Sequence, residues 1–206
     1  MTFQNGERRD GAIVVELIGS VTIVRINRAK YRNSLSIETL EELDTTVSSL
    51  IQNKRIDALI FSGTKDVFAS GADINELASL STLSARRFAR LGQNVFNKIA
   101  NTAQTTVAAI NGYCFGGGLD LALSCDLRCA SVKAVFAHPG AGLGIITGWG
   151  GTQRLPGIIG KARALEMFTT ARRLSSKEAY EMGLVNRLGD PVIDLALEIV
   201  GQRNTH

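Results

Sequence analysis

The chain has 206 residues, 45% of them hydrophobic and only three of them proline, which favours a single globular domain over 1–206 with a core of its own. Its 23 Lys and Arg against 19 Asp and Glu give a net charge of +4 without a basic cluster interleaved with aromatics, so a phosphorylated small molecule is favoured over nucleic acid. No apolar run is long enough to span a membrane and residues 1–10 lack the apolar block of a signal peptide, so we expect a cytoplasmic protein without a membrane partner.

The first expected elements are a strand pair and a helix. Residues 12–17 and 21–27 are rich in Val and Ile and are joined at Gly19 and Ser20, which is typical of an edge hairpin. From Ser36 onward apolar residues recur at intervals of three and four, and this spacing predicts a helix that Ser36 caps.

The rest of the chain alternates short apolar runs with helical periodicity, which is typical of an α/β fold with strand-to-helix crossovers. Six glycines between 138 and 151 form a long loop, of a kind that is more often functional than a simple connector. The sequence predicts strands at 56–62, 105–110, 127–130, 134–137 and 185–188, and helices at 88–99, 161–170, 175–182 and 192–203, the last a partial terminal helix within about 190–206.

The three cysteines, Cys114, Cys125 and Cys129, lie inside apolar segments. Small buried thiols are the ordinary interpretation of such positions, and an odd number of cysteines without ligand spacing does not favour a metal site. We therefore expect no metal.

Two glycine segments stand where strands pass into helices. Gly116, Gly117 and Gly118 follow the strand predicted at 105–110 and open a helix that carries Asp120, and Gly71 and Ala72 open another helix after a strand-like segment. Free N–H groups at two such turns can converge on one oxygen, and each fixed donor aimed at a developing oxyanion contributes about 3–4 kcal/mol. The alternative is that the glycines merely permit tight turns, and the pattern of a nucleotide P-loop is missing.

These motifs, taken in order, resemble those of the crotonase family, the enoyl-CoA hydratase/isomerase superfamily, over about 21–188. The resemblance implies a spiral of ββα units, usually assembled as a homotrimer or a dimer of trimers, that binds an acyl-CoA thioester and needs no cofactor beyond the coenzyme A of its substrate. By matching position, the backbone N–H groups of Ala72 and Gly117 are the implied oxyanion donors. The matching residues are Asn27, Arg28, 33–35, Phe68, 71–74, Leu77, 111–126 and 150–155.

The same resemblance assigns the coenzyme A arm to a basic loop, where Arg28, Lys30 and Arg32 suit phosphate groups. The adenine-contacting stretch falls on 72–74. Gly116, and Trp149 between Gly148 and Gly150, are predicted to line the substrate pocket. Each assignment has a plainer alternative. The loop can be a solvated basic surface, Asp73 a residue that starts a helix, and Trp149 a packing plug. The substrate-binding residues are thus predicted as Arg28, Lys30, Arg32, Asp73, Ile74, Gly116 and Trp149.

The implied acid/base residues depart from the family pattern. Hydratases of this family use two carboxylates to hold a water molecule against the enoyl double bond. The first position is Asp120, shorter than the usual glutamate, and the second is Gly140, which cannot transfer a proton. Proton transfer of this kind contributes about 10²–10⁴-fold, so standard hydration is disfavoured, as is the common isomerase reaction. His138 is the candidate substitute, with an ordinary packed histidine as the alternative.

We therefore predict an acyl-CoA enzyme, a lyase or isomerase, with Ala72, Gly117, Asp120 and His138 at its catalytic centre. Decarboxylation of a malonyl-type thioester, which needs the oxyanion donors and at most one carboxylate, fits these residues better than hydration. The alternative is a degenerate family member that binds acyl-CoA without catalysis. Family members usually continue through further helices, which are largely missing after this chain's last predicted helix, and we expect a more open acyl pocket.

Overall fold

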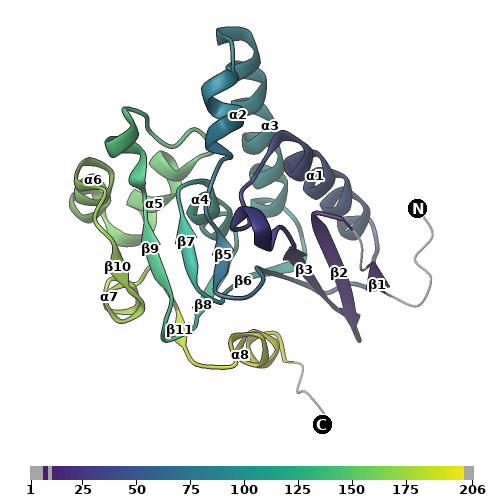
Figure 1. Cartoon of the computed structure of the whole chain (residues 1–206). Helices are drawn as coiled ribbons and strands as arrows, with labels where there is room; N and C mark the ends of the chain where they lie inside the picture. Colours follow the sequence, from purple (N-terminus) through teal and green to yellow (C-terminus); the bar gives the residue numbers. More distant parts are fainter. Residues whose placement is uncertain (1–6, 9–10, 202–206) are drawn as a thin grey trace.

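A computed structural model describes residues 7–8 and 11–201 (Figure 1). The strands form two sheets, one of seven and one of four. The larger has the order β1-β2-β3-β4-β6-β8-β11 and the smaller β10-β9-β7-β5. The strands are β1 (Glu7–Arg8), β2 (Ile13–Ile18), β3 (Val21–Ile26), β4 (Ala58–Ser62), β5 (Val67–Ala69), β6 (Thr105–Ile110), β7 (Tyr113–Phe115), β8 (Leu127–Ala130), β9 (Val135–Ala137), β10 (Leu174–Ser175) and β11 (Arg187–Leu188).

Parallel pairing dominates both sheets. In the larger sheet β3, β4, β6, β8 and β11 run parallel, and only the pairs β1–β2 and β2–β3 are antiparallel. In the smaller sheet β5, β7 and β9 are parallel. Parallel neighbours need long crossovers, and the helices provide them. The helices are α1 (Ile37–Ile51), α2 (Ile74–Ser79), α3 (Thr82–Ala100), α4 (Gly117–Leu123), α5 (Gly151–Ile159), α6 (Lys161–Thr170), α7 (Ser176–Glu181) and α8 (Val192–Ile199), with 3₁₀ turns η1 (Ala29–Tyr31) and η2 (Pro139–Leu143).

The chain repeats one unit, in which a strand of the larger sheet is followed by a strand of the smaller sheet and then by helix. The units β4–β5–α2, β6–β7–α4 and β8–β9–α5 follow this order. The predicted α/β spiral of ββα units is therefore confirmed.

The core has two parts because the central strands are buried on both faces. Residues such as Leu59, Phe61 and Ala108 pack under α1 and α3, whereas the alternate residues Ile60 and Val107 pack against α8 on the other face. Successive side chains of a strand point to opposite faces, which explains why these strands are apolar throughout rather than alternating. Figure 1 shows α8 on the opposite side of the larger sheet from α1 and α3.

Most of the predicted elements are confirmed. The hairpin is β2–β3, and Ser36 caps α1 by accepting a hydrogen bond from the Thr39 N–H at 3.2 Å. The strands at 105–110 and 127–130 and the helix at 161–170 have the predicted bounds. The terminal helix is described as α8, and 202–206 lie outside the described residues.

Three local predictions are corrected. The triple glycine does not follow the strand at 105–110 directly, because β7 of the smaller sheet lies between them. The helix after Gly71 begins at Ile74 with Asp73 as its cap, rather than at the glycine. Helix α5 was not predicted, because Pro156 and the glycines before it have low helical propensity, which burial of Leu155 and Ile159 overcomes.

Candidate active site

The carboxyl ends of the three parallel strands of the smaller sheet bring the predicted site together. Residues 70–72 follow β5, Gly116 and Gly117 follow β7, and His138 follows β9. Ligands of open parallel sheets bind outside the carboxyl ends of the strands, and a cavity of about 250 Å³ lies here.

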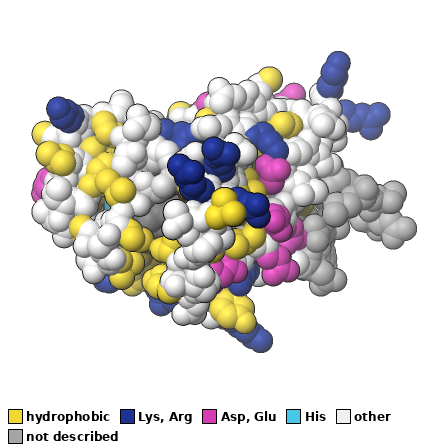
Figure 2. Space-filling model, turned by 90° about the horizontal axis from the view of Figure 1, so that it is seen from above, with side chains coloured by type: hydrophobic (Ala, Val, Ile, Leu, Met, Phe, Trp, Pro, Cys, Tyr) yellow, Lys and Arg dark blue, Asp and Glu magenta, His cyan; other side chains and the backbone are white. Residues whose placement is uncertain are grey.

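The cavity has a buried floor and an exposed apolar rim. Phe88, Asp120, His138 and Trp149 line it and are buried. The lining residues Ile74, Leu143, Ile145 and Ile146 are exposed. Seen from above, the surface is hollowed beside hydrophobic side chains, and Lys and Arg side chains gather nearby (Figure 2).

Other residues are excluded at each of the three glycines at the start of α4, for a different steric or conformational reason at each position. Gly116 has φ 52°, in the left-handed region that other residues rarely adopt. A Cβ on Gly117 would lie 2.2 Å from the Trp149 ring, and a Cβ on Gly118 would lie 2.3 Å from the Ala69 carbonyl oxygen. The backbone of α4 therefore approaches the ring and the strand more closely than any side chain allows.

The two predicted oxyanion donors lie on the same wall of the cavity. A Cβ on Gly71 would lie 3.1 Å from the Gly117 nitrogen, so the turn before Ala72 touches the start of α4. Leu35 holds this turn, because its N–H donates to the Gly71 carbonyl at 2.8 Å. Within residues 11–201, neither the Ala72 N–H nor the Gly117 N–H has a hydrogen-bond partner. Both N–H groups are therefore unpaired at the cavity wall, and their role as oxyanion donors stays a prediction.

The carboxyl group of Asp120 is fully buried and is held by one of its two oxygens. Oδ2 accepts a hydrogen bond from Thr147 Oγ1, and Oδ1 has no partner. Burial raises the pKa of Asp120 to about 7, although hydrogen bonds from Thr147 and the Trp149 N–H and the charge of Arg154 oppose the rise. A Cβ on Gly151 would lie 2.1 Å from Oδ1, so this glycine makes the space for the carboxyl group. Asp120 is a candidate proton carrier near neutral pH.

His138 faces the free oxygen of Asp120. Its Nε2 lies 3.6 Å from Asp120 Oδ1, too far for a good hydrogen bond, and Nε2 also has no partner. The imidazole is buried, packs on Phe168 at 5.0 Å between ring centroids, and its pKa is lowered by burial to about 4. Between about pH 4 and pH 7 both groups are therefore uncharged, with Asp120 protonated and His138 neutral.

Gly140 lies in η2, where the family pattern would place the second carboxylate. A Cβ there would lie 2.6 Å from the Ile145 carbonyl oxygen, and the Ile145 N–H donates to the Gly140 carbonyl at 3.0 Å. The segment is folded tightly on itself, so a larger residue at 140 requires the loop to move.

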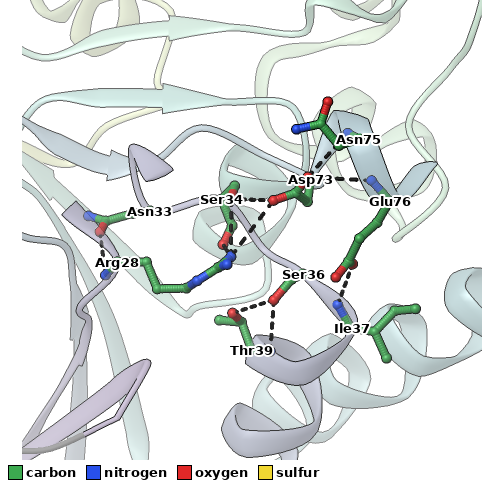
Figure 3. Close-up of polar contacts among 9 residues, drawn as sticks. All are labelled: Arg28, Asn33, Ser34, Ser36, Ile37, Thr39, Asp73, Asn75 and Glu76. Atoms are coloured by element: carbon green, nitrogen blue, oxygen red, sulfur yellow. Dashed lines mark hydrogen bonds and ion pairs between the residues drawn. The ribbon is translucent and has the colours of Figure 1, made fainter. Parts of the chain in front are cut away.

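Arg28 of the basic loop is tied to the protein interior. Its Nη1 donates to the carbonyl and hydroxyl oxygens of Ser34 at 2.8 and 3.1 Å and lies 3.9 Å from Asp73 Oδ2 (Figure 3). The Arg28 guanidinium also stacks over the Tyr31 ring at 4.7 Å. Arg28 therefore braces the loop, and a contact with coenzyme A stays a prediction for it.

Asp73 has a structural part as well. Its carboxylate caps α2 by accepting from the Asn75 and Glu76 N–H groups and receives a hydrogen bond from Ser34 Oγ at 3.0 Å (Figure 3). This bond joins α2 to the loop after β3, so the plainer interpretation of Asp73 as a helix-start residue has direct support. Ile74, the first residue of α2, is exposed at the rim.

Lys30, Tyr31 and Arg32 leave their side chains at the surface. The Arg32 guanidinium lies 5.3 Å from the centroid of the Tyr113 ring, and Tyr113 in turn contacts Phe115 edge to face at 5.4 Å. Lys30 and Arg32 are thus the predicted phosphate-binding cations that remain accessible.

Trp149 is both a wall of the cavity and a packing residue. Its ring contacts Phe88 and Phe96 edge to face at 5.1 and 5.7 Å. The sequence did not predict three features of this region. These are Phe88 in the cavity wall, the space that Gly151 leaves for Asp120, and the position of Arg154, which donates to the Trp149 carbonyl at 3.0 Å. The signal for Phe88 was its apolar spacing, which indicates a buried helix face but not the cavity that it borders.

Other site types find no support in the part of the chain that the structure describes. No group of three or more His, Cys, Asp and Glu side chains there is placed to hold a metal ion. The three cysteines are buried, as predicted. Among the same residues, no helix combines the length and apolar character that crossing a membrane requires.

Comparison with known proteins agrees with this geometry. The family model of enoyl-CoA hydratase/isomerase matches residues 16–200. The short-chain-enoyl-CoA hydratase of Clostridium acetobutylicum is 37% identical over 193 residues, which are 92% of this chain and 74% of that protein. The crotonyl-CoA hydratase of Syntrophomonas wolfei is 39% identical over 180 residues, 87% of this chain and 69% of that protein. The crystal structure of the enoyl-CoA hydratase from Bacillus anthracis superposes with a TM-score of 0.89 and 34% identity, covering 93% of this chain and 76% of that one.

The chain therefore belongs to the enoyl-CoA hydratase/isomerase family, the crotonase superfamily, as its motifs predicted.

The tight fold around Gly140 predicts the effect of a side chain there. We expect Gly140→Ala to lower the free energy of unfolding by about 1–3 kcal/mol, because the added methyl group overlaps the Ile145 carbonyl oxygen. Gly142→Ala is the matched control, since no atom lies within 4 Å of a Cβ at that position. Chemical denaturation measures both, and equal stability of the two variants would contradict the described loop.

Burial of Asp120 predicts a pH-dependent gain of stability in Asp120→Asn. Folding raises the pKa of the Asp120 carboxyl group to about 7. The free energy of unfolding of the wild type therefore falls as the pH rises from about 4 to 7, and above pH 7 the folded protein buries a full negative charge. The asparagine never ionises. We expect its Tm to exceed that of the wild type at pH 8 by several degrees, since about 1 kcal/mol corresponds to roughly 2–4 °C in a domain of this size. The gain should shrink at pH 5. An equal gain at both pH values would show that Asp120 does not titrate as described.

Proposed function

We propose that this protein catalyses the reversible hydration of short 2-enoyl-CoA thioesters, with Asp120 and His138 as its acid/base pair. The observation that carries the proposal is the pair itself, in which two buried titratable atoms without partners, Asp120 Oδ1 and His138 Nε2, lie 3.6 Å apart in the cavity wall. A separation slightly beyond a hydrogen bond leaves both atoms free to contact one water molecule and the substrate. The relatives named short-chain-enoyl-CoA hydratase and crotonyl-CoA hydratase support the enoyl-CoA substrate.

The free N–H groups of Ala72 and Gly117 stabilise the thioester oxygen. Hydration places negative charge on that oxygen when the double bond is attacked, and fixed backbone donors stabilise this charge without reorganising. Glycine at 117 allows the carbonyl to approach the helix start closely, and the N-terminal end of α4 adds its positive dipole. The same donors serve any reaction of the family that passes through an enolate.

The proton transfers follow from the uncharged state of the pair. His138 Nε2 accepts a proton from the water molecule as its oxygen bonds to C3 of the enoyl group, and the electron pair of the double bond moves to the thioester oxygen. Asp120 Oδ1 then gives its proton to C2 as the enolate collapses. The imidazolium and carboxylate that result are adjacent, and transfer of the proton from Nε2 to Oδ1 restores the starting state. Thr147 keeps Oδ2 occupied, so Oδ1 is the oxygen that carries the proton.

Outside the cavity, the accessible cations suit the phosphates of coenzyme A. Lys30 and Arg32 remain exposed, Arg32 beside the Tyr113 ring, and neither is committed to an ion pair within the described residues. Ile74 at the rim offers an apolar surface to the adjoining part of the coenzyme. Phosphates stay hydrated beside these cations while the acyl group enters the apolar cavity.

Gly140 favours a second candidate, decarboxylation of a 2-carboxyacyl-CoA. The position of the family's second carboxylate is closed to a side chain. Decarboxylation needs no activated water: the bond to the carboxylate breaks, its electron pair forms the enolate held by Ala72 and Gly117, carbon dioxide leaves, and Asp120 supplies the proton to C2. An acyl-CoA-binding protein without activity is the remaining alternative.

The proposal predicts the rates of two variants. We expect Asp120→Asn and His138→Ala each to lower kcat for hydration of crotonyl-CoA by about 10²–10⁴-fold, because each removes one partner of the proton transfers. Loss of the enoyl thioester absorbance measures the rate. Asp57→Asn, an exposed aspartate outside the cavity, is the control and should retain the wild-type rate.

Each other outcome selects a different function. A wild-type rate in His138→Ala would refute the acid/base pair. Decarboxylation would replace hydration if the wild type hydrates no enoyl-CoA but releases carbon dioxide from 2-carboxyacyl-CoA thioesters. Asp120→Asn should then abolish the release of carbon dioxide. If calorimetry shows tight binding of butyryl-CoA and neither substrate class is turned over, the protein would be an acyl-CoA-binding protein without catalytic activity.

The pH dependence of hydration tests the direction of proton transfer. Asp120 must carry its proton, so kcat/KM should fall as pH rises above about 7, and His138 must be neutral, so the rate should fall only near pH 4 on the acid side. A rate that rises with pH through 7 would mean that the ionised carboxylate is the active form, and would contradict this assignment.

A further inference from the structure

The floor of the cavity limits how far an acyl chain can extend. The ligand is the acyl-CoA of the proposed function, on which this inference rests. The phosphates must stay in water at the exposed rim, so the acyl group points toward the buried floor. Phe88 and Trp149, 5% and 4% exposed, form the apolar part of that floor.

The Trp149 ring fills space that other residues would occupy. A Cβ on Gly92 of α3 would lie 2.4 Å from the ring, and a Cβ on Gly117 of α4 would lie 2.2 Å from it. The indole is thus inserted between two glycines, one of which carries an oxyanion donor. The ring therefore lies directly beside the place where the thioester carbonyl binds.

The ring has no room to move aside. Phe88 and Phe96 contact it edge to face, and both are buried. The backbone is held on both sides, because Gln93 Nε2 donates to the Gly148 carbonyl at 2.7 Å and Arg154 Nη1 donates to the Trp149 carbonyl at 3.0 Å. Rotation of the indole would require α3 and the loop before α5 to separate.

We propose that Trp149 determines the length of acyl chain that the site accepts. The cavity of about 250 Å³ is smaller than the roughly 300–1,000 Å³ usual for small-molecule sites, so the accepted acyl group is short and unbranched, with about four to six carbons. A longer chain meets the indole before its thioester reaches the donors. The competing route for a long chain is out across the apolar rim at Leu143, Ile145 and Ile146.

The test compares kcat/KM for 2-enoyl-CoA substrates of four to twelve carbons between the wild type and Trp149→Leu. Each added methylene that a closed pocket excludes changes kcat/KM by about 10–200-fold, so the wild-type values should drop steeply beyond six carbons. In Trp149→Leu the ratio of ten-carbon to four-carbon kcat/KM should rise at least about tenfold, mainly through a lower KM for the longer substrate. The ratio is the readout, because a merely structural change lowers all chain lengths together.

Phe96→Leu is the matched control. Phe96 contacts the Trp149 ring but does not line the cavity, so the variant loosens the packing without enlarging the floor directly. Its chain-length ratio should stay within about threefold of the wild type. An equal shift in both variants would show that loosening, rather than the volume of the indole, changes the profile, and would overturn the proposal.

Two further outcomes separate this proposal from the proposed function. A wild-type profile that stays flat to twelve carbons would mean that chains leave across the rim, and it would refute the role of Trp149 while hydration stands. If the wild type hydrates no substrate, the proposed function fails, and calorimetry with saturated butyryl-, octanoyl- and dodecanoyl-CoA tests the role of Trp149 instead. Affinity that falls with chain length in the wild type and recovers in Trp149→Leu would support that role. Equal affinities for the three ligands would overturn it. If Trp149→Leu does not fold, Phe88→Leu replaces it with the same expected shift, because Phe88 also lines the cavity and contacts the indole.

Discussion

Helix α4 begins in a space that only glycine can occupy, because the Trp149 ring lies against Gly117 on one side and Ala69 lies against Gly118 on the other. This close approach sets the rest of the site. It brings the first N–H groups of α4 to the carboxyl ends of β5 and β7, beside the turn that carries Ala72. It also directs Asp120, one helical turn further on, into the buried side of the cavity, where α5 begins. A side chain at either glycine would force the helix away from the strand or from the ring, and the N–H groups of Ala72 and Gly117 would no longer share a wall of the cavity.

Burial gives Asp120 and His138 their chemical character. A carboxylate in an apolar interior is costly, and the Thr147 hydroxyl, the Trp149 backbone N–H and the charge of Arg154 lower this cost only in part. The carboxyl group therefore keeps its proton until the pH rises to about 7, while the same burial keeps the imidazole neutral above about pH 4. Stability and chemistry oppose each other here, because the protein carries a group whose ionisation destabilises the fold and whose proton suits a transfer to carbon. Two neutral groups with unused atoms are a different solution from the pair of carboxylates that the family resemblance implies.

The loop that contains Gly140 connects this chemistry to substrate selection. It folds back on itself through Ile145, leaves no room for a side chain at 140, and then presents Thr147 to Asp120 and Trp149 to the floor of the cavity. Position 140 and position 149 therefore lie on one structural unit, so a change in the loop alters both the available proton carriers and the depth of the pocket. The apolar residues that this loop leaves exposed at the rim stand where coenzyme A enters under the proposed function. The braces at Arg28 and Asp73 hold the opposite side of the entrance.

The sequence by itself determined the secondary structure of β2, β3, α1, β6, β8 and α6, because apolar spacing and local caps such as Ser36 act within one element. It also determined the family, since ordered motifs such as the triple glycine with Asp120 survive as a linear pattern. Helix α5 escaped prediction because its burial overrides the weak propensity of Pro156. Only the tertiary structure decided that Oδ1 of Asp120 faces Nε2 of His138, that Phe88 joins Trp149 in the floor, and that Arg28 and Asp73 brace each other. These contacts join residues far apart in the sequence. Parallel pairing of β5, β7 and β9, for example, brings His138 to Asp120, eighteen positions earlier in the chain, a relation that no local spacing encodes.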